Sequence, residues 1–212
     1  PRLPMNVYAR SKHAAEDLAF AACRDGVRAA VVRLSNVYGS ARDHRDRVVP
    51  AFARAAAHGA SLRIDGADRL YDFTHIDDVA RGLEALVARL EAGAASPPPI
   101  HFVSGTGTTL GELAALAVSL AGTSSVITEG PPRDYDVARF QGDPARAFAL
   151  LGWRAQVPLH LGLGPPLLRR HLGLHLEALI GRVLPDELLR SPRQLDLGGQ
   201  LVLLDRPLLL HR

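Results

Sequence analysis

Lysine is almost absent from this sequence of 212 residues: Lys12 is the only one, and the other 24 basic residues are arginines. Cysteine is equally scarce, because Cys23 stands alone and excludes a disulfide within the chain. A single cysteine is typical of a reducing compartment, so we expect a cytoplasmic protein. No apolar run reaches the roughly 20 residues that a membrane span needs, and the first residues show no signal-peptide pattern. We therefore expect no membrane partner.

The positive charge is spread along the chain rather than collected in a block. The formal net charge is +3, from 25 Lys plus Arg against 22 Asp plus Glu. A nucleic-acid-binding surface gathers its basic residues on one face or in one run. Nucleic-acid binding is therefore an alternative that this even distribution argues against, and we expect no nucleic-acid partner.

Segments typical of strands and helices alternate up to residue 152. Short apolar runs predict strands at 28–34, 61–64, 100–104 and 124–128, and 71–93 predicts a strand followed by a helix. Helices are predicted at 9–24, 48–59, 108–122 and 143–153, whereas 35–46 has the polar composition of a loop. This alternation predicts the α/β class. Residues 165–212 hold 17 Leu, with room for a helix or two, but follow no pattern that predicts one structure.

Acidic residues stand where two of these helices begin. Asp77 and Asp78 are predicted to cap the helix that follows them, because a carboxylate there satisfies free N–H groups and the helix dipole. Asp143 is predicted as an N-cap with Pro144 as the first helical residue. The cap interpretation of "THIDD" is favoured over a metal cluster that would add His75, and we expect no metal.

Lys12 follows Tyr8 by four residues, so the two share one face of the predicted helix. A free Tyr has a pKa near 10 and is a poor base at neutral pH, but a neighbouring ammonium stabilises the phenolate. A Tyr–Lys pair at this spacing can therefore exchange a proton with a substrate hydroxyl. Such pairs also arise by chance, so the spacing alone does not decide between the two interpretations.

Six segments, in their order along the chain, resemble the extended short-chain dehydrogenases/reductases, namely the NAD-dependent epimerase/dehydratase group that acts on nucleotide sugars. They are "YARSK", "RLSNVYG", "RVVPAFARAAAHGASLRIDG", "YDFTHIDDVARG", "HFVSGTGTTLGELA" and "PPRDYDVARFQGDPARAFALLGW". The resemblance covers roughly residues 1–164 and leaves 165–212 as a Leu-rich tail of unknown role. It implies the C-terminal part of a Rossmann-type doubly wound sheet, interleaved with a small α/β substrate domain.

The resemblance implies a role for three residues at the cofactor. Tyr8 would be the general acid/base, and Lys12 would hold the nicotinamide ribose and tune Tyr8. Ser35 matches a position on the nicotinamide side of the cofactor. The cofactor would be NAD, with NADP as an alternative, and the complete protein would be a homodimer.

The substrate residues that the resemblance implies are spread over the rest of the chain. Asn36 would bind the diphosphate of a nucleotide sugar, Val48 and Arg63 would line the nucleotide pocket, Arg133 would pair with the diphosphate, and Asp136 matches a ribose-side or Arg-orienting acid. The implied reaction oxidises the sugar with NAD⁺, after which the keto-sugar is re-reduced, dehydrated or decarboxylated.

The sequence departs from the family at three points. Tyr71 replaces an Arg that would contact phosphate, for which Arg69 is a candidate substitute, and Tyr135 replaces a Gly. No Gly-x-x-Gly-x-x-Gly turn for the pyrophosphate is present, since "GTGTTLG" has other spacing and follows a later strand. We therefore expect a C-terminal portion of such an enzyme. The alternative is a non-catalytic remnant or a partner-dependent subunit, in which half a sheet would expose a strand edge.

Overall fold

The computed structural model describes residues 7–40, 43–133, 137–164 and 200–204. The helices are α1 (Val7–Arg24), α2 (Val48–Ala57), α3 (Ile76–Glu91), α4 (Leu110–Ala121), α5 (Ala145–Leu151) and α6 (Leu159–Gly162). The strands are β1 (Ala29–Leu34), β2 (Asn36–Tyr38), β3 (Leu62–Asp65), β4 (Leu70–His75), β5 (Ile100–Phe102), β6 (Gly107–Thr109), β7 (Ile127–Gly130) and β8 (Gln200–Leu204).

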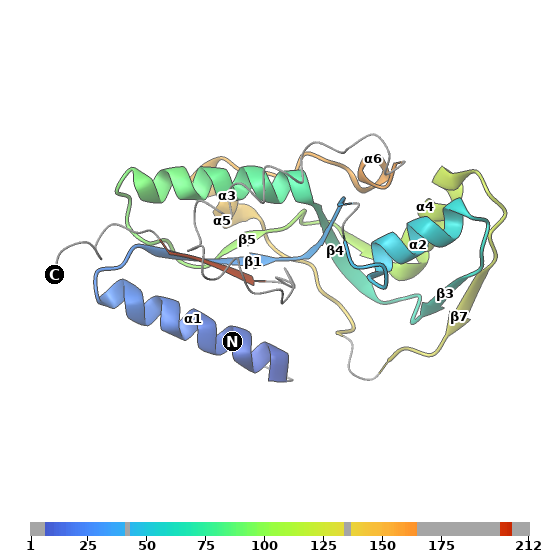
Figure 1. Cartoon of the computed structure of the whole chain (residues 1–212), viewed down its shortest axis with the longest axis horizontal. Helices are drawn as coiled ribbons and strands as arrows, with labels where there is room; N and C mark the ends of the chain where they lie inside the picture. Colours follow the sequence, from blue (N-terminus) through green and yellow to red (C-terminus); the bar gives the residue numbers. More distant parts are fainter. Residues whose placement is uncertain (1–6, 41–42, 134–136, 165–199, 205–212) are drawn as a thin grey trace.

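One part of the fold is a sheet with helices on both faces, as Figure 1 shows. Its strand order is β5-β1-β8, and β1 and β5 are parallel. Helix α1 lies on one face, whereas α3 and α5 lie on the other. A parallel pair of strands covered on both faces is the arrangement of doubly wound α/β proteins, so the predicted fold class is confirmed.

Alternation along β1 divides its side chains between these two layers. Ala30, Val32 and Leu34 enter a core with residues of α3 and β5, while Arg33 reaches Glu16 of α1 on the other face. Trp153 belongs to the first core, as predicted, and its ring centroid lies 4.8 Å from that of Phe102. Both faces of β1 are thus buried, as the continuous apolar run predicted.

Strand β8 lies in the Leu-rich tail, for which the sequence predicted no single structure. It pairs antiparallel with β1 over five residue pairs, from Ala29 with Leu204 to Arg33 with Gln200. Strand β8 therefore covers one edge of β1. A short apolar run such as "QLVLL" does not by its periodicity distinguish strand from helix, so only the partner strand decides. The remainder of the tail, 165–199 and 205–212, lies outside the described residues.

A second core lies between two small sheets and the helices α2 and α4. Strand β2 is parallel to β4, which is antiparallel to β6, and β3 is parallel to β7. The core residues shared by these elements include Phe52, Leu62, Ile64, Phe73 and Leu113. Helices α2 and α4 flank β3 and β7 in Figure 1, so this part forms a second packed unit beside the first sheet.

Two short strands lie where the sequence predicted other structure. Strand β2 falls inside the predicted loop 35–46, and β6 overlaps the start of the predicted helix 108–122. Each has three residues and pairs with β4, Asn36 opposite Phe73 and Thr108 opposite Tyr71. Three residues are too few to show a period of two. Both segments are strands because they form hydrogen bonds with β4. Strand β7 also begins at Ile127, three residues later than predicted.

The predicted caps are only partly right. The N-cap of α3 is His75, whose Nδ1 accepts a hydrogen bond from the backbone N–H of Asp77 at 3.3 Å. Asp78 is fully buried and serves a distant segment, as described below. Helix α5 begins at Ala145, one residue later than predicted, and the Asp143 carboxylate accepts from the N–H of Ala145 at 2.8 Å.

None of the helices in the described part of the chain has the length and apolar character of a membrane span.

His101 on β5 makes stability depend on pH near neutrality. Burial lowers the pKa of His101 below its ordinary value, the charges of Arg33 and Arg146 lower it further, and Asp143 and Glu16 oppose the shift. The unfolded chain therefore binds this proton more readily than the folded chain, and stability falls as pH drops below about 6.5. We expect the urea midpoint to decrease between pH 7 and 5.5, and to decrease less in His101→Gln. Equal slopes for the two proteins would contradict this.

Candidate active site

The Tyr8–Lys12 pair lies on the first turns of α1, as predicted. The Nζ of Lys12 is 5.3 Å from the centroid of the Tyr8 ring, within the range of a cation–π contact. The Tyr8 ring is exposed, and the hydroxyl of Ser11 donates to the backbone oxygen of Tyr8 at 2.8 Å. The ammonium and the phenol therefore stand together on a surface that a ligand can reach.

Glu16 sets the orientation of this pair. Its buried carboxylate accepts two hydrogen bonds from the Arg33 guanidinium, each at 2.8 Å. These bonds raise the pKa of Arg33, burial opposes the shift, and the Glu16 charge adds to it. Tyr8, Lys12 and Glu16 follow one another at intervals of four, so they share one side of α1. Because Glu16 faces the sheet, Lys12 and Tyr8 lie on the sheet side of the helix.

Helix α1 runs antiparallel to β1, since Cys23 contacts Ala29 at the start of the strand and Glu16 contacts Arg33 near its end. Tyr8 precedes Glu16 by eight residues, which is about 12 Å along a helix. Tyr8 therefore lies toward the carboxyl end of β1, since the N-terminal end of α1 is directed the same way as the arrowhead of β1 in Figure 1. Ligands of open α/β sheets bind outside the carboxyl ends of the strands.

Ser35 immediately follows β1 and belongs to a buried polar chain. Its Oγ lies 2.7 Å from the Oγ1 of Thr74, which donates to the Asp72 carboxylate at 3.4 Å. A carboxylate only accepts, so Thr74 directs its proton to Asp72 and Ser35 donates to Thr74. The lone pairs of Ser35 then remain available to accept a hydrogen bond.

Asp72 is the central acceptor of this hydrogen-bond network and was not selected from the sequence. Its buried carboxylate also accepts from the N–H and the hydroxyl of Ser104, both at 2.9 Å, and from the N–H of Gly105 at 2.8 Å. It thereby joins β4 to the loop that follows β5. The available signal was an acidic residue inside the apolar strand "YDFTH", which is tolerated only where partners satisfy it.

Arg63, predicted in the nucleotide pocket, and Arg133, predicted at the diphosphate, converge on one carboxylate. Arg63 Nε donates to Asp65 Oδ1 at 2.9 Å, and Arg133 Nε lies 4.0 Å from Asp65 Oδ2. Arg63 and Asp65 belong to β3, whereas Arg133 follows β7, the strand that pairs with β3. The structure therefore brings these two predicted residues together, through a third residue that the sequence analysis did not select.

The other predicted substrate residues lie on separate elements. Asn36 is half-buried on β2, and Val48 opens α2, where it packs against the second core. Asp136 and Tyr135 lie outside the described residues. Arg69 approaches Gly66, the residue that follows Asp65: a Cβ built at Gly66 would be 2.9 Å from the Cγ of Arg69.

The Gly-rich segment "GTGTTLG" leads into α4, whose N-terminus is already capped. The Thr109 hydroxyl accepts from the N–H of Glu112, and the Glu112 carboxylate accepts from the N–H of Thr109 at 2.7 Å. The Thr109 hydroxyl also donates to the Glu112 carboxylate, at 2.9 Å. The pKa of Glu112 is lowered mainly by the bond from the Thr109 backbone and further by the bond from this hydroxyl. A carboxylate at this helix end disfavours a phosphate, in line with the sequence interpretation.

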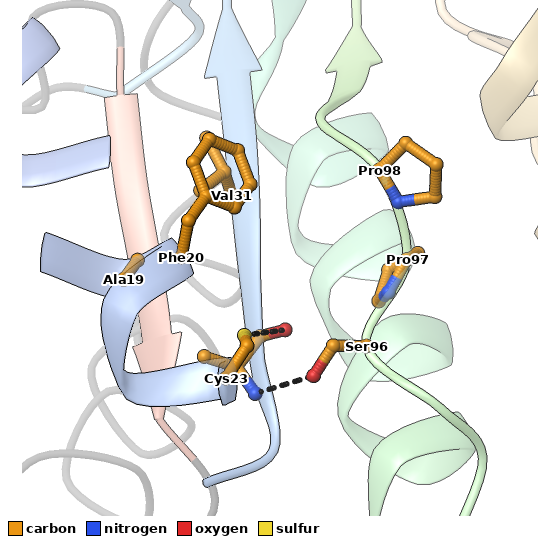
Figure 2. Close-up of a pocket in the computed structure, with 8 residues that line it drawn as sticks. Ala19, Phe20, Cys23, Val31, Ser96, Pro97 and Pro98 are labelled. Atoms are coloured by element: carbon orange, nitrogen blue, oxygen red, sulfur yellow. Dashed lines mark hydrogen bonds between the residues drawn. The ribbon is translucent and has the colours of Figure 1, made fainter. Parts of the chain in front are cut away.

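The described residues contain no group of three or more His, Cys, Asp or Glu side chains that could hold a metal ion. A cavity of about 230 Å³ lies between α1, β1 and the segment 96–98, as Figure 2 shows. Cys23 lines it and donates to the backbone oxygen of Ala29, while the N–H of Ala29 donates to Ser96 Oγ. None of the predicted site residues lines this cavity, so we assign the candidate site to the carboxyl end of β1.

A parallel pair of strands covered on both faces, with a Tyr–Lys pair toward the carboxyl end of β1, is the arrangement of a Rossmann-type α/β protein. Comparison with known proteins makes this more specific. Residues 1–103 match the model of the NAD dependent epimerase/dehydratase family. This match to 103 of the 212 residues agrees with the resemblance inferred from the sequence.

Individual relatives agree with this assignment. The chain is 31% identical over 163 residues to UDP-glucuronic acid decarboxylase 1 of Danio rerio, covering 76% of this chain and 38% of the relative. It superposes on the structure of UDP-glucose 4-epimerase of Thermotoga maritima with UDP-glucose, with a TM-score of 0.66 and 29% identity. The superposition covers 74% of this chain and 50% of the epimerase. For MoeE5 in complex with UDP-glucuronic acid and NAD, the TM-score is 0.68 and the identity 28%, and the superposition covers 76% of this chain and 54% of MoeE5. The chain thus spans 38% to 54% of these proteins' lengths.

Proposed function

We propose that this chain forms the catalytic-tyrosine and substrate-binding part of an NAD-dependent nucleotide-sugar epimerase or dehydratase. The observation that carries the proposal is the common face of Tyr8, Lys12 and Glu16 on α1. The ion pair of the buried Glu16 with Arg33 holds this face toward the carboxyl end of β1, where an α/β fold binds its ligands. The family match of residues 1–103 supports the same function.

The donors and acceptors at this end of the sheet fit a nicotinamide ribose. The ammonium of Lys12 has three donors for ribose hydroxyls, and the available lone pairs of Ser35 suit an amide N–H. When bound, NAD⁺ supplies an acceptor for a hydride from the sugar carbon. The Tyr8 phenolate takes the proton of the hydroxyl on that carbon, and the charge of Lys12 stabilises the phenolate beforehand.

The second part of the fold would bind the nucleotide end of the substrate. Arg63 and Arg133 provide guanidinium groups for the diphosphate, which binds planar, paired donors well. Asn36 contributes a further polar contact, and Val48 and Asp136 complete the nucleotide side. Relatives with this fold bind UDP-glucose or UDP-glucuronic acid, so a nucleotide sugar is the proposed substrate. A homodimer is the proposed assembly of the complete protein.

Turnover of nucleotide sugars tests the proposal. The full-length protein is incubated with NAD⁺ and a panel of UDP- and dTDP-sugars, and products are separated by chromatography while NADH is followed by absorbance. We expect conversion of at least one sugar into an epimer, a dehydrated product or a decarboxylated product. Absence of turnover with every sugar, by a folded protein, would contradict the proposal and favour the alternative of a non-catalytic or partner-dependent chain.

A further inference from the structure

Asp65 occupies the place between the two arginines proposed to bind the diphosphate. One carboxylate oxygen accepts from Arg63 Nε at 2.9 Å, and the other lies 4.0 Å from Arg133 Nε. Each arginine is therefore directed at a negative charge that belongs to the chain itself. A diphosphate requires the same donors, because guanidinium N–H groups pair with carboxylate and phosphate oxygens in the same geometry.

The backbone around Asp65 is built to keep this arrangement. Gly130 of β7 stands opposite Asp65, and a Cβ there would be 2.6 Å from Asp65 Oδ1 and 3.2 Å from the Nη2 of Arg63. A side chain at Gly130 would have to displace the ends of the Asp65 and Arg63 side chains. The N–H of Gly66 donates to the oxygen of Gly130 at 3.1 Å, and a Cβ at Gly66 would be 2.9 Å from Pro132. The segment that carries Arg133 is thus packed beside Asp65.

The ion pairs themselves are weak enough to exchange. The side chains of Arg63 and Arg133 are 73% and 53% exposed, whereas that of Asp65 is 26% exposed. Water and salt screen such pairs strongly, so an incoming anion with two or more charges can displace the carboxylate. Asp65 stays in place when this happens, because its backbone belongs to β3, and its charge then opposes the bound anion.

We propose that Asp65 is an internal competitor of the diphosphate, which holds Arg63 and Arg133 in the free protein and lowers the affinity of this site for anions. The proposal rests on the proposed function, because it takes the two arginines as the diphosphate site. It adds a residue that determines affinity and that discriminates against singly charged anions, which cannot displace the carboxylate from both arginines.

Inorganic pyrophosphate is the probe, measured by titration calorimetry on the full chain at low salt. We expect Asp65→Asn to bind pyrophosphate about fivefold more tightly than the wild type, the effect of one exposed ion pair. The matched control is Glu129→Gln, which removes the same charge from the next strand. Glu129 is in register with Ile64, so it lies on the other face of the sheet from Asp65. We expect less than a twofold change for it.

The Arg63→Gln background tests whether the tighter binding of pyrophosphate arises from the release of Arg63. In that background we expect Asp65→Asn to raise the pyrophosphate affinity by less than twofold. An unchanged or weaker affinity of Asp65→Asn, or an equal gain in Glu129→Gln, would overturn the role of Asp65 and leave the proposed enzyme function standing. Absence of pyrophosphate binding by every variant would overturn both this inference and the arginine site. The sugar-turnover assay, which depends on Tyr8, then decides the proposed function separately.

Discussion

Replacement of Tyr8 by Phe is expected to lower kcat of the full-length protein by about a thousandfold, within the range of 10² to 10⁴ for loss of a general acid/base. The substitution removes one oxygen and leaves the ring next to Lys12, whose Nζ lies 5.3 Å from the ring centroid. The anchor of the helix, the ion pair of Glu16 with Arg33, does not involve that oxygen. We therefore expect substrate affinity to stay within about threefold, since the loss is confined to proton transfer.

Tyr71→Phe is the matched control for this experiment. It removes the same atom from a tyrosine of β4, whose hydroxyl donates to the backbone oxygen of Val137 at 2.9 Å. We expect kcat of Tyr71→Phe to remain within about fivefold of the wild type. The values of kcat are compared by steady-state kinetics with the nucleotide sugar that the wild type converts fastest. Equal losses in the two variants, or unchanged turnover in Tyr8→Phe, would contradict the role of Tyr8 as the acid/base.

Asp78→Asn is expected to lower the free energy of unfolding by about 3 kcal/mol, the size found when one partner of a buried polar network is removed. The Asp78 carboxylate is fully buried in the first turn of α3. Its two oxygens accept from the N–H groups of Gln156 and Val157, each at 3.0 Å, and it also pairs with Arg81. An amide can accept only one of these backbone bonds and turns its NH₂ group toward the other donor.

Asp77→Asn is the control, because it removes the same charge from the same helix start. Asp77 pairs with His75 at 3.4 Å, within the same helix start. We expect it to cost less than about 1 kcal/mol. Urea unfolding is followed by the fluorescence of Trp153, the single tryptophan, whose Nε1 donates to the backbone oxygen of Asp78 at 2.8 Å. Equal destabilisation by the two variants would refute a special role of Asp78.

The locations of β1, α1 and α3 were predictable, because both helices are long enough to show the helical period and β1 is a continuous apolar run. The run 28–34 and the helical pattern 9–24 reproduce β1 and α1 within two residues. By contrast, β2, β6 and β8 have three to five residues and exist through their partners β4 and β1. Local sequence does not contain the hydrogen-bonding partner of such a strand, so these elements could not be predicted.

The candidate site shows the same division. The pairing of Tyr8 with Lys12 follows from spacing on one helix, and the structure brings them together as predicted. The acids that organise the site, Glu16, Asp65 and Asp72, were not selected, because their partners are distant in the sequence or belong to another element. An acidic residue has the same local signature on a solvated surface and in a satisfied buried pair.

The sequence by itself determined the α/β class, the family resemblance and the identity of the Tyr–Lys pair, since each depends on local period or on ordered motifs. Only the tertiary structure decided which way that pair faces, because the orientation of α1 depends on the ion pair of Glu16 with Arg33, which stands 17 residues away in the sequence. It also decided that Asp78 fastens α3 to residues 156 and 157 instead of capping the helix, and that Asp65 stands between two arginines. In each case the partner is selected by packing, which places side chains together that no local pattern connects.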